Sequence, residues 1–497
     1  MDLGKNCMHL NTFTSWVPDM KLKNEVEKTC FKYFVQLSNA NQIKIPLQML
    51  AALLEFYNTD GEYFKFGDVV LDIGLEDILY ITGLPIDGKQ VSGVEHKNAT
   101  ATIVEHLSIT EAEAKDLLLV TKRDKQSFDI DLGKLRAKFK DSTISDENLA
   151  SHVKAYLLYL LGEVLLNTPS SNTISYIYLP FLDIDRIDSY AWGAAVLATL
   201  KVSMRKLCSG ETRTLSGFTY ALMVFAFERF ACLRNLYGVR TPFGFPLMVG
   251  WVEISHAKLR KNTLTNVEIF SEQLSNVKNE NVDWCPYKRD GCGLPNELEH
   301  QTWMVYAKVY SICFENIAKH PVDVCWRQLG LEKEEVRTDL TKLKDVKLQK
   351  RGPKKDKDWR STKCYKPYND RWVERNMFLI KEGFSYDGQL VNYEQVLETA
   401  SPTHHVHHVD DEATEVVTHS EGGSSSRESS PSQSTEPVIE ASDDADDTRA
   451  PHTIVRYSRL LRELSPVSPP RHAKRQSKRV DPFLFIPIPT TWLCERN

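Results

Sequence analysis

The chain has 497 residues, of which 42% are hydrophobic and 26% charged, with a formal net charge of −5. This length allows about three domains or one large domain with a tail. The second is favoured because the apolar residues are concentrated before Gly383, whereas the remainder is polar. The overall charge indicates no class of partner, so its distribution along the chain has to be considered.

Two classes of protein are excluded. The ten cysteines show no closely spaced framework, and the N-terminus lacks the basic start and apolar core of a secretory signal. We therefore expect reduced thiols and a cytosolic or nuclear protein. The most apolar runs, residues 155–166 and 219–233, contain charged residues and are too short to span a bilayer, so no membrane partner is expected.

A small hairpin and a short helix are predicted early in the chain. Residues 63–73 alternate bulky apolar and polar side chains, which is typical of a half-buried β-hairpin. The apolar residues of 75–81 follow at helical spacing. Gly83 suits the left-handed closing position, and Pro85 prevents continuation of the helix. Asp87-Gly88 then predicts a tight turn.

The rest of the first 383 residues is mostly helical in pattern. Thr110 and Glu113 form a capping box. The adjacent Glu228 and Arg229 inside an apolar helix predict buried or half-buried paired charges rather than a catalytic acid. The periodicity predicts further helices over residues 22–37, 47–57, 111–120, 146–166, 188–207, 216–232, 302–319, 322–329 and 370–382. The fold class is therefore mainly α, a large single helical domain with a small β-hairpin near residues 63–73.

The C-terminal part has a different composition. Residues 410–447 contain twelve acidic residues and one basic residue, whereas residues 449–479 contain nine basic residues and one acidic residue. Such a tail is expected to be disordered. Within it, a short basic cluster predicts a nuclear localisation signal, formed by Arg471, Lys474, Arg475, Lys478 and Arg479.

Several motifs are similar to those of the plant mobile domain, a transposon-related family. Residues 75–93, LEDILYITGLPIDGKQVSG, resemble the family's LEDV..LLGLPVDG.PVTG. Later matches are HVKAYLLYLLGEVLL (152–166), IDRI (184–187), Trp192-Gly193, FERF (227–230), WCPY (284–287), Cys313–Glu315, His320, Asp323, Val324, RQLGL (327–331), Arg351-Gly352, Asp358-Trp359 and Trp372. The family's proline-ended Q-x-I-P is replaced by Glu332–Val336.

The resemblance covers about residues 21–383. It divides the chain into an N-terminal extension (1–20), a plant mobile domain (21–383), an acidic-then-basic tail (384–480) and a short apolar end (481–497). The resemblance implies a nuclear, non-enzymatic domain associated with transposable elements, gene silencing and genome maintenance, which some members join to a phosphatase module. It implies no cofactor.

The family's label "aminotransferase-like" does not fit the residues. A pyridoxal-phosphate enzyme needs a Schiff-base lysine beside a phosphate-cradling loop on an α/β scaffold. The chain has neither a glycine-rich strand-to-helix turn nor alternating βα units. We therefore expect a protein that is not an enzyme.

Two sets of residues are candidate metal ligands. Asp183, Asp185 and Asp188 are compatible with divalent metal and nuclease chemistry, but helix capping and an Asp185–Arg186 pair explain them more simply. Cys285 and Cys292 lack the short spacing of zinc fingers, so structural thiols are favoured.

The strongest binding candidate is the basic segment, residues 342–381, with fourteen Lys and Arg against five Asp and Glu. It includes Trp359, Tyr365, Tyr368 and Trp372, and such a segment can contact phosphates and stack on bases. The predicted contact residues are Lys350, Arg351, Lys354, Lys355, Lys357 and Arg360. A solvated loop beside a charged helix face is the alternative, since nothing here reads a base specifically.

Three functions follow. The favoured one is a nuclear scaffold that binds DNA or RNA through phosphates, or chromatin, in silencing, genome maintenance or development. The second is a transposase-derived accessory factor that uses metal at the aspartates. The third is a protein-interaction scaffold whose partners are nuclear proteins, such as a phosphatase-type partner or a family paralogue.

Overall fold

The computed structural model describes residues 5–6, 10–38, 43–120, 126–168, 172–259, 264–289, 291–340 and 356–381. Two compact units divide the chain, Met1–Thr403 and His404–Asn497, and all described residues belong to the first. The predicted disordered tail lies outside the described residues, and the predicted domain boundaries remain predictions.

The described part of the first unit is mainly α, as predicted. Its α-helices are α1 (Leu10–Phe13), α2 (Met20–Val26), α3 (Phe34–Ser38), α4 (Leu47–Leu54), α5 (Leu75–Thr82), α6 (Ala99–Leu107), α7 (Glu111–Leu117), α8 (Leu132–Phe139), α9 (Leu149–Leu160), α10 (Trp192–Cys208), α11 (Thr219–Arg229), α12 (Ala231–Tyr237), α13 (Leu247–Ile254), α14 (Val267–Ser275), α15 (Asn296–Glu299) and α16 (Lys366–Val373). None of the described helices is both long and apolar enough to cross a membrane.

Short turns of other helix types connect these elements. Two are π-helical, η1 (Leu161–Leu165) and η4 (Ser255–Leu259). The 3-10 turns are η2 (Tyr176–Phe181), η3 (Ile187–Ser189), η5 (Asn279–Asn281), η6 (Pro286–Lys288), η7 (Thr302–Tyr306), η8 (Trp326–Leu329), η9 (Lys333–Glu335) and η10 (Arg375–Phe378).

The strands form small separate sheets. They are β1 (Lys5–Asn6) with β9 (Thr214–Leu215), β2 (Tyr57–Asn58) with β3 (Tyr63–Phe66) and β4 (Val69–Leu71), β5 (Val94–Glu95) with β12 (Lys357–Asp358), β6 (Leu118–Val120) with β7 (Gln126–Asp131) and β8 (Thr173–Ser175), and β10 (Tyr310–Cys313) with β11 (Asn316–Lys319). The predicted hairpin is confirmed as β3 and β4, in which Phe64 pairs with Leu71 and Phe66 with Val69. All four side chains are buried, so the alternation marks the core face.

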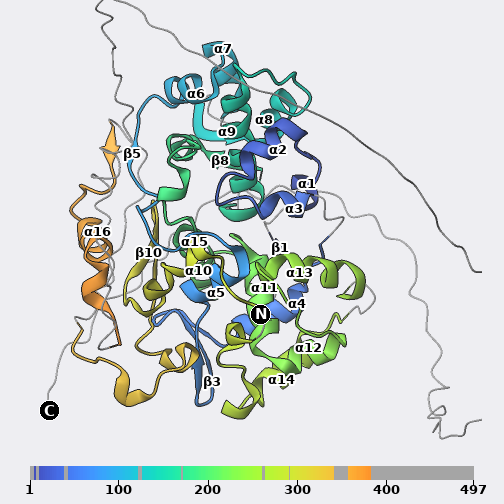
Figure 1. The fold of residues 1–497 in the computed structure, drawn as a ribbon, viewed down its shortest axis with the longest axis vertical. Coiled ribbons are helices and arrows are strands. Elements are labelled where there is room, and N and C mark those ends of the chain that lie inside the picture. Colours follow the sequence, from blue (N-terminus) through green and yellow to red (C-terminus); the bar gives the residue numbers. More distant parts are fainter. Residues whose placement is uncertain are drawn as a thin grey trace, which may run out of the picture. The chain divides into compact units, whose positions relative to one another are not determined.

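Helix α10 lies at the centre of the unit. It packs against α5 and against both strands of the β10–β11 hairpin, while α11 packs against α5, α12 and α13. In Figure 1, α6, α7, α8 and α9 gather at the top, α12 and α14 lie at the lower right, and α16 runs along the left side. Each fully buried Leu or Phe of this core contributes about 1.5–3 kcal/mol to stability.

The motif around α5 folds as its sequence predicts. Gly83 closes the helix in the left-handed region, with φ of 72°. The chain then passes very close to the start of α10, where the Gly193 N–H donates to the Pro85 carbonyl at 2.7 Å. A Cβ on Gly193 would lie 2.9 Å from the Ile86 side chain. The Trp192-Gly193 motif is therefore explained by close packing of two backbones.

The helix predicted over residues 302–319 is wrong. The structure has the turn η7 followed by the β10–β11 hairpin, with Phe314 in the left-handed region at φ of 47°. Strand β10 is buried on both faces, so it lacks the alternation that distinguishes a strand from a buried helix. This segment covers α10.

Other predicted helices have different ends. The helix over 22–37 is interrupted between α2 and α3, because the Cys30 N–H donates to Asp188 at 2.7 Å and the chain turns there. As a result Asp188 does not cap α10, which begins only at Trp192. The helix over 216–232 breaks at Phe230, whose ψ is 98°. The helix over 370–382 is instead α16, which ends at Val373.

Candidate functional site

Only part of the predicted nucleic-acid contact set is described. Lys350, Arg351, Lys354 and Lys355 lie outside the described residues, as do the five residues of the predicted nuclear localisation signal, Arg471, Lys474, Arg475, Lys478 and Arg479. Lys357 and Arg360 lie in and just after β12, which pairs antiparallel with β5. Lys357 stands over the Trp359 ring, 3.3 Å from its centroid. Arg360 binds the Asp358 carboxylate through Nε at 3.0 Å and Nη2 at 3.1 Å.

The aromatic residues of the basic segment are not available as an exposed stacking surface. Trp359, Tyr365, Tyr368 and Trp372 are all buried. They hold the segment on the domain: the Trp359 indole donates to Glu95 at 3.1 Å, and the Trp372 indole donates to the Gly88 carbonyl at 3.0 Å. The predicted stacking of bases on an exposed face of these four rings does not fit the structure.

A cleft of about 730 Å³ lies beside the Asp87-Gly88 turn, and we refer to it as the turn cleft. Its lining residues are Gly88, Lys89, Gln90, Ser92, Gly93, Phe181, Tyr190, Arg360, Asn369, Trp372, Val373 and Arg375. They include three cations and no carboxylate. The GLPIDGKQVSG motif thus contributes to the lining of a surface cavity, together with Arg360, which sequence analysis predicts as a phosphate contact.

The turn is fixed on both sides. Lys89 exchanges backbone hydrogen bonds with Ser189 and Ala191, each of 2.8 Å. Gly88 has φ of 124°, and a Cβ there would lie 2.5 Å from the Ser189 carbonyl oxygen, so glycine is required. Arg375 donates to Asp87 through Nε at 2.8 Å and Nη2 at 2.6 Å. The cleft is therefore preorganised by its own backbone and by a partly buried ion pair.

A second cleft, of about 590 Å³, has the opposite chemistry. Its lining carries the carboxylates Glu95, Asp129 and Glu315 beside Lys206 and several hydroxyl side chains. Negative lining repels phosphate groups, so of these two clefts only the turn cleft suits an anionic ligand.

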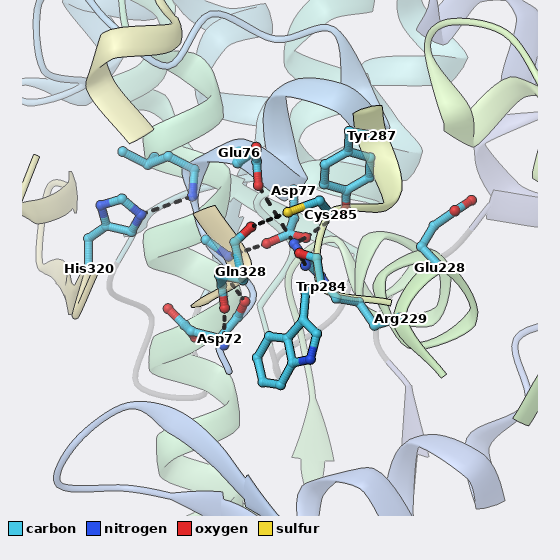
Figure 2. Close-up of polar contacts among 12 residues, drawn as sticks. Asp72, Glu76, Asp77, Glu228, Arg229, Trp284, Cys285, Tyr287, His320 and Gln328 are labelled. Atoms are coloured by element: carbon cyan, nitrogen blue, oxygen red, sulfur yellow. Dashed lines mark hydrogen bonds and ion pairs between the residues drawn. The ribbon is translucent and has the colours of Figure 1, made fainter. Parts of the chain in front are cut away.

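Several charged and polar motif residues, from LEDI, FERF, WCPY and RQLGL together with His320, meet in a buried network, which Figure 2 shows. Arg229, fully buried at the end of α11, donates to Asp77 of α5 at 2.8 Å and lies 3.7 Å from Glu76. Tyr287 of the WCPY motif donates to the same Asp77 oxygen at 2.6 Å. Asp77 also accepts the Gly74 N–H at 2.8 Å. The network joins α5, α11 and η6 in the core.

The two halves of the FERF charge pair have separate partners. Glu228 accepts from the Trp251 indole at 2.7 Å and from Arg289 at 2.6 Å, and in Figure 2 its carboxylate points away from the Arg229 cluster. The prediction of buried, paired charges at Glu228 and Arg229 is confirmed. Their partners, Asp77 and Arg289, come from elsewhere in the chain.

A second part of the network surrounds Asp72 and His320. Lys201, fully buried within α10, donates to Asp72 at 2.6 Å and to the Lys319 carbonyl at 2.7 Å. The Gln328 amide pairs with the Asp72 backbone, accepting its N–H at 2.8 Å and donating to its carbonyl at 3.1 Å. The sequence signal for this cluster was a lysine inside an apolar helix, which sequence analysis did not single out.

Burial controls the charge states in this network. It raises the pKa of Asp72 to about 7, although Lys201 opposes the shift. It raises the pKa of Glu76 to about 7 against the attraction of Arg229. Burial alone would lower the pKa of Arg229, but Asp77, Tyr287 and Glu76 raise it, so the guanidinium stays charged.

His320 is neutral because burial lowers its pKa to about 3. Its ring nitrogens lie 2.9 Å from the Ala307 carbonyl and 3.3 Å from the Leu75 N–H. These contacts fix a tautomer that donates from Nδ1 and accepts at Nε2. The ring is therefore a structural bridge between the β11 end and the start of α5.

The candidate metal ligands serve other contacts. Asp183 pairs with Arg186 at 2.9 Å, Asp188 accepts the Cys30 N–H, and Cys285 Sγ lies 3.9 Å from the Gln328 carbonyl. The predicted Asp185–Arg186 pair is replaced by the Asp183–Arg186 pair. Among the described residues, no three His, Cys, Asp or Glu side chains are placed to hold a metal ion together.

Comparison with known proteins agrees with the motifs. The chain is 25% identical over 326 residues to Protein MAIN-LIKE 1 of Arabidopsis thaliana. The matched region covers 65% of this chain and 61% of that protein. It is 26% identical over 329 residues to Protein MAINTENANCE OF MERISTEMS of the same plant, covering 64% of each. A third relative, the Arabidopsis thaliana serine/threonine-protein phosphatase 7 long form homolog, is 26% identical over 309 residues, 58% of this chain and 22% of that protein.

The chain therefore spans less than two thirds of the length of these relatives. No solved structure matches it significantly. The family model for the plant mobile domain matches residues 33–389, well over half of the chain. Together with the motif residues that meet in the core, this match shows that the chain belongs to the plant mobile domain family.

Proposed function

We propose that this protein is a non-enzymatic nuclear factor that acts in genome maintenance, silencing or development by binding nucleic acid or chromatin. The proposal rests on the burial and pairing of the motif residues. Asp77, Arg229, Tyr287 and His320 are buried and paired with one another or with backbone groups. Their chemistry stabilises the fold, so function is left to the surface.

The buried lysine does not favour a transaminase. Lys201 is fully buried and donates to Asp72 and to a backbone carbonyl, whereas a Schiff-base lysine must be reached by its cofactor and substrate. The phosphatase name of one relative belongs to a protein of which the match covers only 22%. The name MAINTENANCE OF MERISTEMS, in contrast, supports a developmental role for the shared domain.

Nucleic-acid binding by the basic segment is tested by its salt dependence. If about four of the cations between Lys350 and Arg360 contact duplex phosphates, log affinity falls against log salt with a slope near −0.9 per contact. Replacing Lys354 and Lys355 with Ala is expected to flatten the slope by about two units. Fluorescence anisotropy titrations of labelled duplex DNA at several salt concentrations measure this slope.

The matched control changes two lysines of α2, Lys21→Ala with Lys23→Ala, whose ammonium groups pair with Asp146 and Glu27. This variant should keep the parent slope. Absence of binding at low salt, or equal slopes for parent and Lys354/Lys355 variant, would remove the segment from the mechanism. The protein-interaction function would then be favoured, with the exposed Val373 and Met377 as its first candidate surface.

Nuclear import is tested separately. Changing Arg471, Lys474, Arg475, Lys478 and Arg479 to Ala is expected to leave a fluorescent fusion in the cytoplasm, because a basic cluster of this kind is bound by import receptors. Live-cell imaging in plant cells measures the nuclear-to-cytoplasmic ratio. The control replaces basic residues Arg449, Arg456 and Arg459 of the same tail. Undiminished nuclear accumulation of the five-residue variant would contradict the assignment.

A further inference from the structure

The turn cleft has the size of a site for one small ligand group. Its volume of about 730 Å³ falls within the range of about 300–1,000 Å³ that is usual for small-molecule sites. Three regions far apart in sequence form it: the turn at residues 88–93, Phe181 with Tyr190, and Arg360 with residues 369–375.

The polar groups of the cleft suit an anion with hydrogen-bonding edges. Arg360 uses Nε and Nη2 for Asp358, and its Nη1 has no hydrogen bond within the described residues, while about half of the side chain is exposed. Gln90 and Asn369 meet at the rim, where the Gln90 amide donates to Asn369 at 3.3 Å. Amide side chains can exchange such a weak mutual contact for the edge of a base.

The apolar part of the cleft is aromatic. The partly exposed Tyr190 packs edge-on against Phe181, with ring centroids 5.0 Å apart. Trp372 also lines the cleft, and its indole donates to the Gly88 carbonyl. Arg186 and Arg360 both contribute to the positive field at Tyr190, and of the two only Arg360 is among the lining residues of the cleft. An aromatic ring beside an arginine is the arrangement on which unpaired bases stack in proteins that bind single strands.

We propose that the turn cleft binds one unstacked nucleotide of a single-stranded nucleic acid, with its base against Tyr190 and Arg360 and its phosphate in the field of Lys89 and Arg360. This inference rests on the proposed nucleic-acid function and names its substrate class. The stacked bases of a duplex cannot enter a cavity of this kind without being extruded.

The test compares two single-stranded probes of equal charge, an octathymidylate and an eight-unit abasic strand, in anisotropy titrations of the full chain at low salt. The parent is expected to bind the thymidylate about tenfold more tightly, because one stacked base contributes about that factor. Arg360→Ala and Tyr190→Leu are each expected to bring this ratio close to one. Lys366→Ala is the matched control, since this exposed lysine of α16 pairs with Asp370 outside the cleft, and it should keep the ratio.

The outcomes separate the two proposals. A variant with Lys350, Arg351, Lys354 and Lys355 all changed to Ala should lose affinity for both probes by the same factor. It should therefore keep the parent's ratio of thymidylate to abasic affinity. Equal binding of both probes by the parent, with loss in this four-cation variant, overturns the cleft inference and leaves the proposed function standing. Failure of the parent to bind either single-stranded probe overturns the cleft inference, and the duplex titrations at several salt concentrations then decide the proposed function. Thermal melting checks that the Tyr190→Leu variant is folded. If that variant is unfolded, the binding ratio of the Arg360→Ala variant, which changes a surface residue, tests the cleft inference.

Discussion

Replacing Arg229 with methionine is expected to lower the free energy of unfolding by about 3–5 kcal/mol. The change leaves the fully buried Asp77 without its cation, and it also removes the hydrogen bond to the Trp284 carbonyl. An uncompensated charge in the core is among the most destabilising of single changes. Urea unfolding, followed by circular dichroism, measures the effect.

A surface pair provides the control. Arg186, whose side chain is 59% exposed, pairs with Asp183, and Arg186→Met should change stability by less than about 1 kcal/mol. Adding Asp77→Leu to Arg229→Met should recover part of the loss, because both buried charges are then absent. If Arg229→Met were as mild as Arg186→Met, the ionic network would not be a main determinant of stability.

Replacing Glu163 with glutamine is expected to have the opposite effect, raising stability by about 3 kcal/mol at pH 8. Glu163 lies in the π-helical turn η1 and is only 1% exposed. Burial raises its pKa from 4.5 to about 7, with Arg136 opposing the shift. Among the described residues its Oε1 has no hydrogen-bond partner. The folded protein therefore keeps a proton that the unfolded chain releases.

The sign of the pH dependence follows from this difference. Between pH 4.5 and about 7 the folded state binds more protons at Glu163 than the unfolded state, so the parent loses stability as the pH rises. The gain from Glu163→Gln should be near zero at pH 4.5 and grow to its full value by pH 8. Unfolding free energies of parent and variant across this range measure it. The exposed Glu147 supplies the control, since Glu147→Gln should give a flat difference, and a flat difference for Glu163→Gln would refute the prediction.

Local features of this fold can be read from the sequence. The β3–β4 hairpin, the α5 helix and its Gly83 closure follow from alternation, helical spacing and turn chemistry within a few residues. The β10 strand could not be predicted in the same way, because a short apolar run that is buried on both faces has no period of its own. Its strand form is decided by packing on α10.

The sites depend on contacts that no local pattern contains. A lysine in an apolar helix indicates a buried charge, but the partner of Lys201 is Asp72, 129 residues earlier. Asp87-Gly88 is recognisable as a turn, yet Tyr190, Arg360 and Arg375 reach it only through the fold. Sequence alone therefore identified the wall of the turn cleft and one of its cations, and missed the cavity.

The long reach of the buried network affects how the chain can fold during its synthesis. Along the chain, Asp77 lies 152 residues before Arg229 and 210 residues before Tyr287, and Asp72 lies 256 residues before Gln328. Until these segments have been synthesised, the Asp77 carboxylate and the backbone groups of Asp72 lack the partners that they need for burial. The domain should therefore remain open and dependent on chaperones until translation of the family region is nearly complete. We therefore expect a nascent chain halted before Trp284 to be handled by quality control rather than to act as a smaller working module.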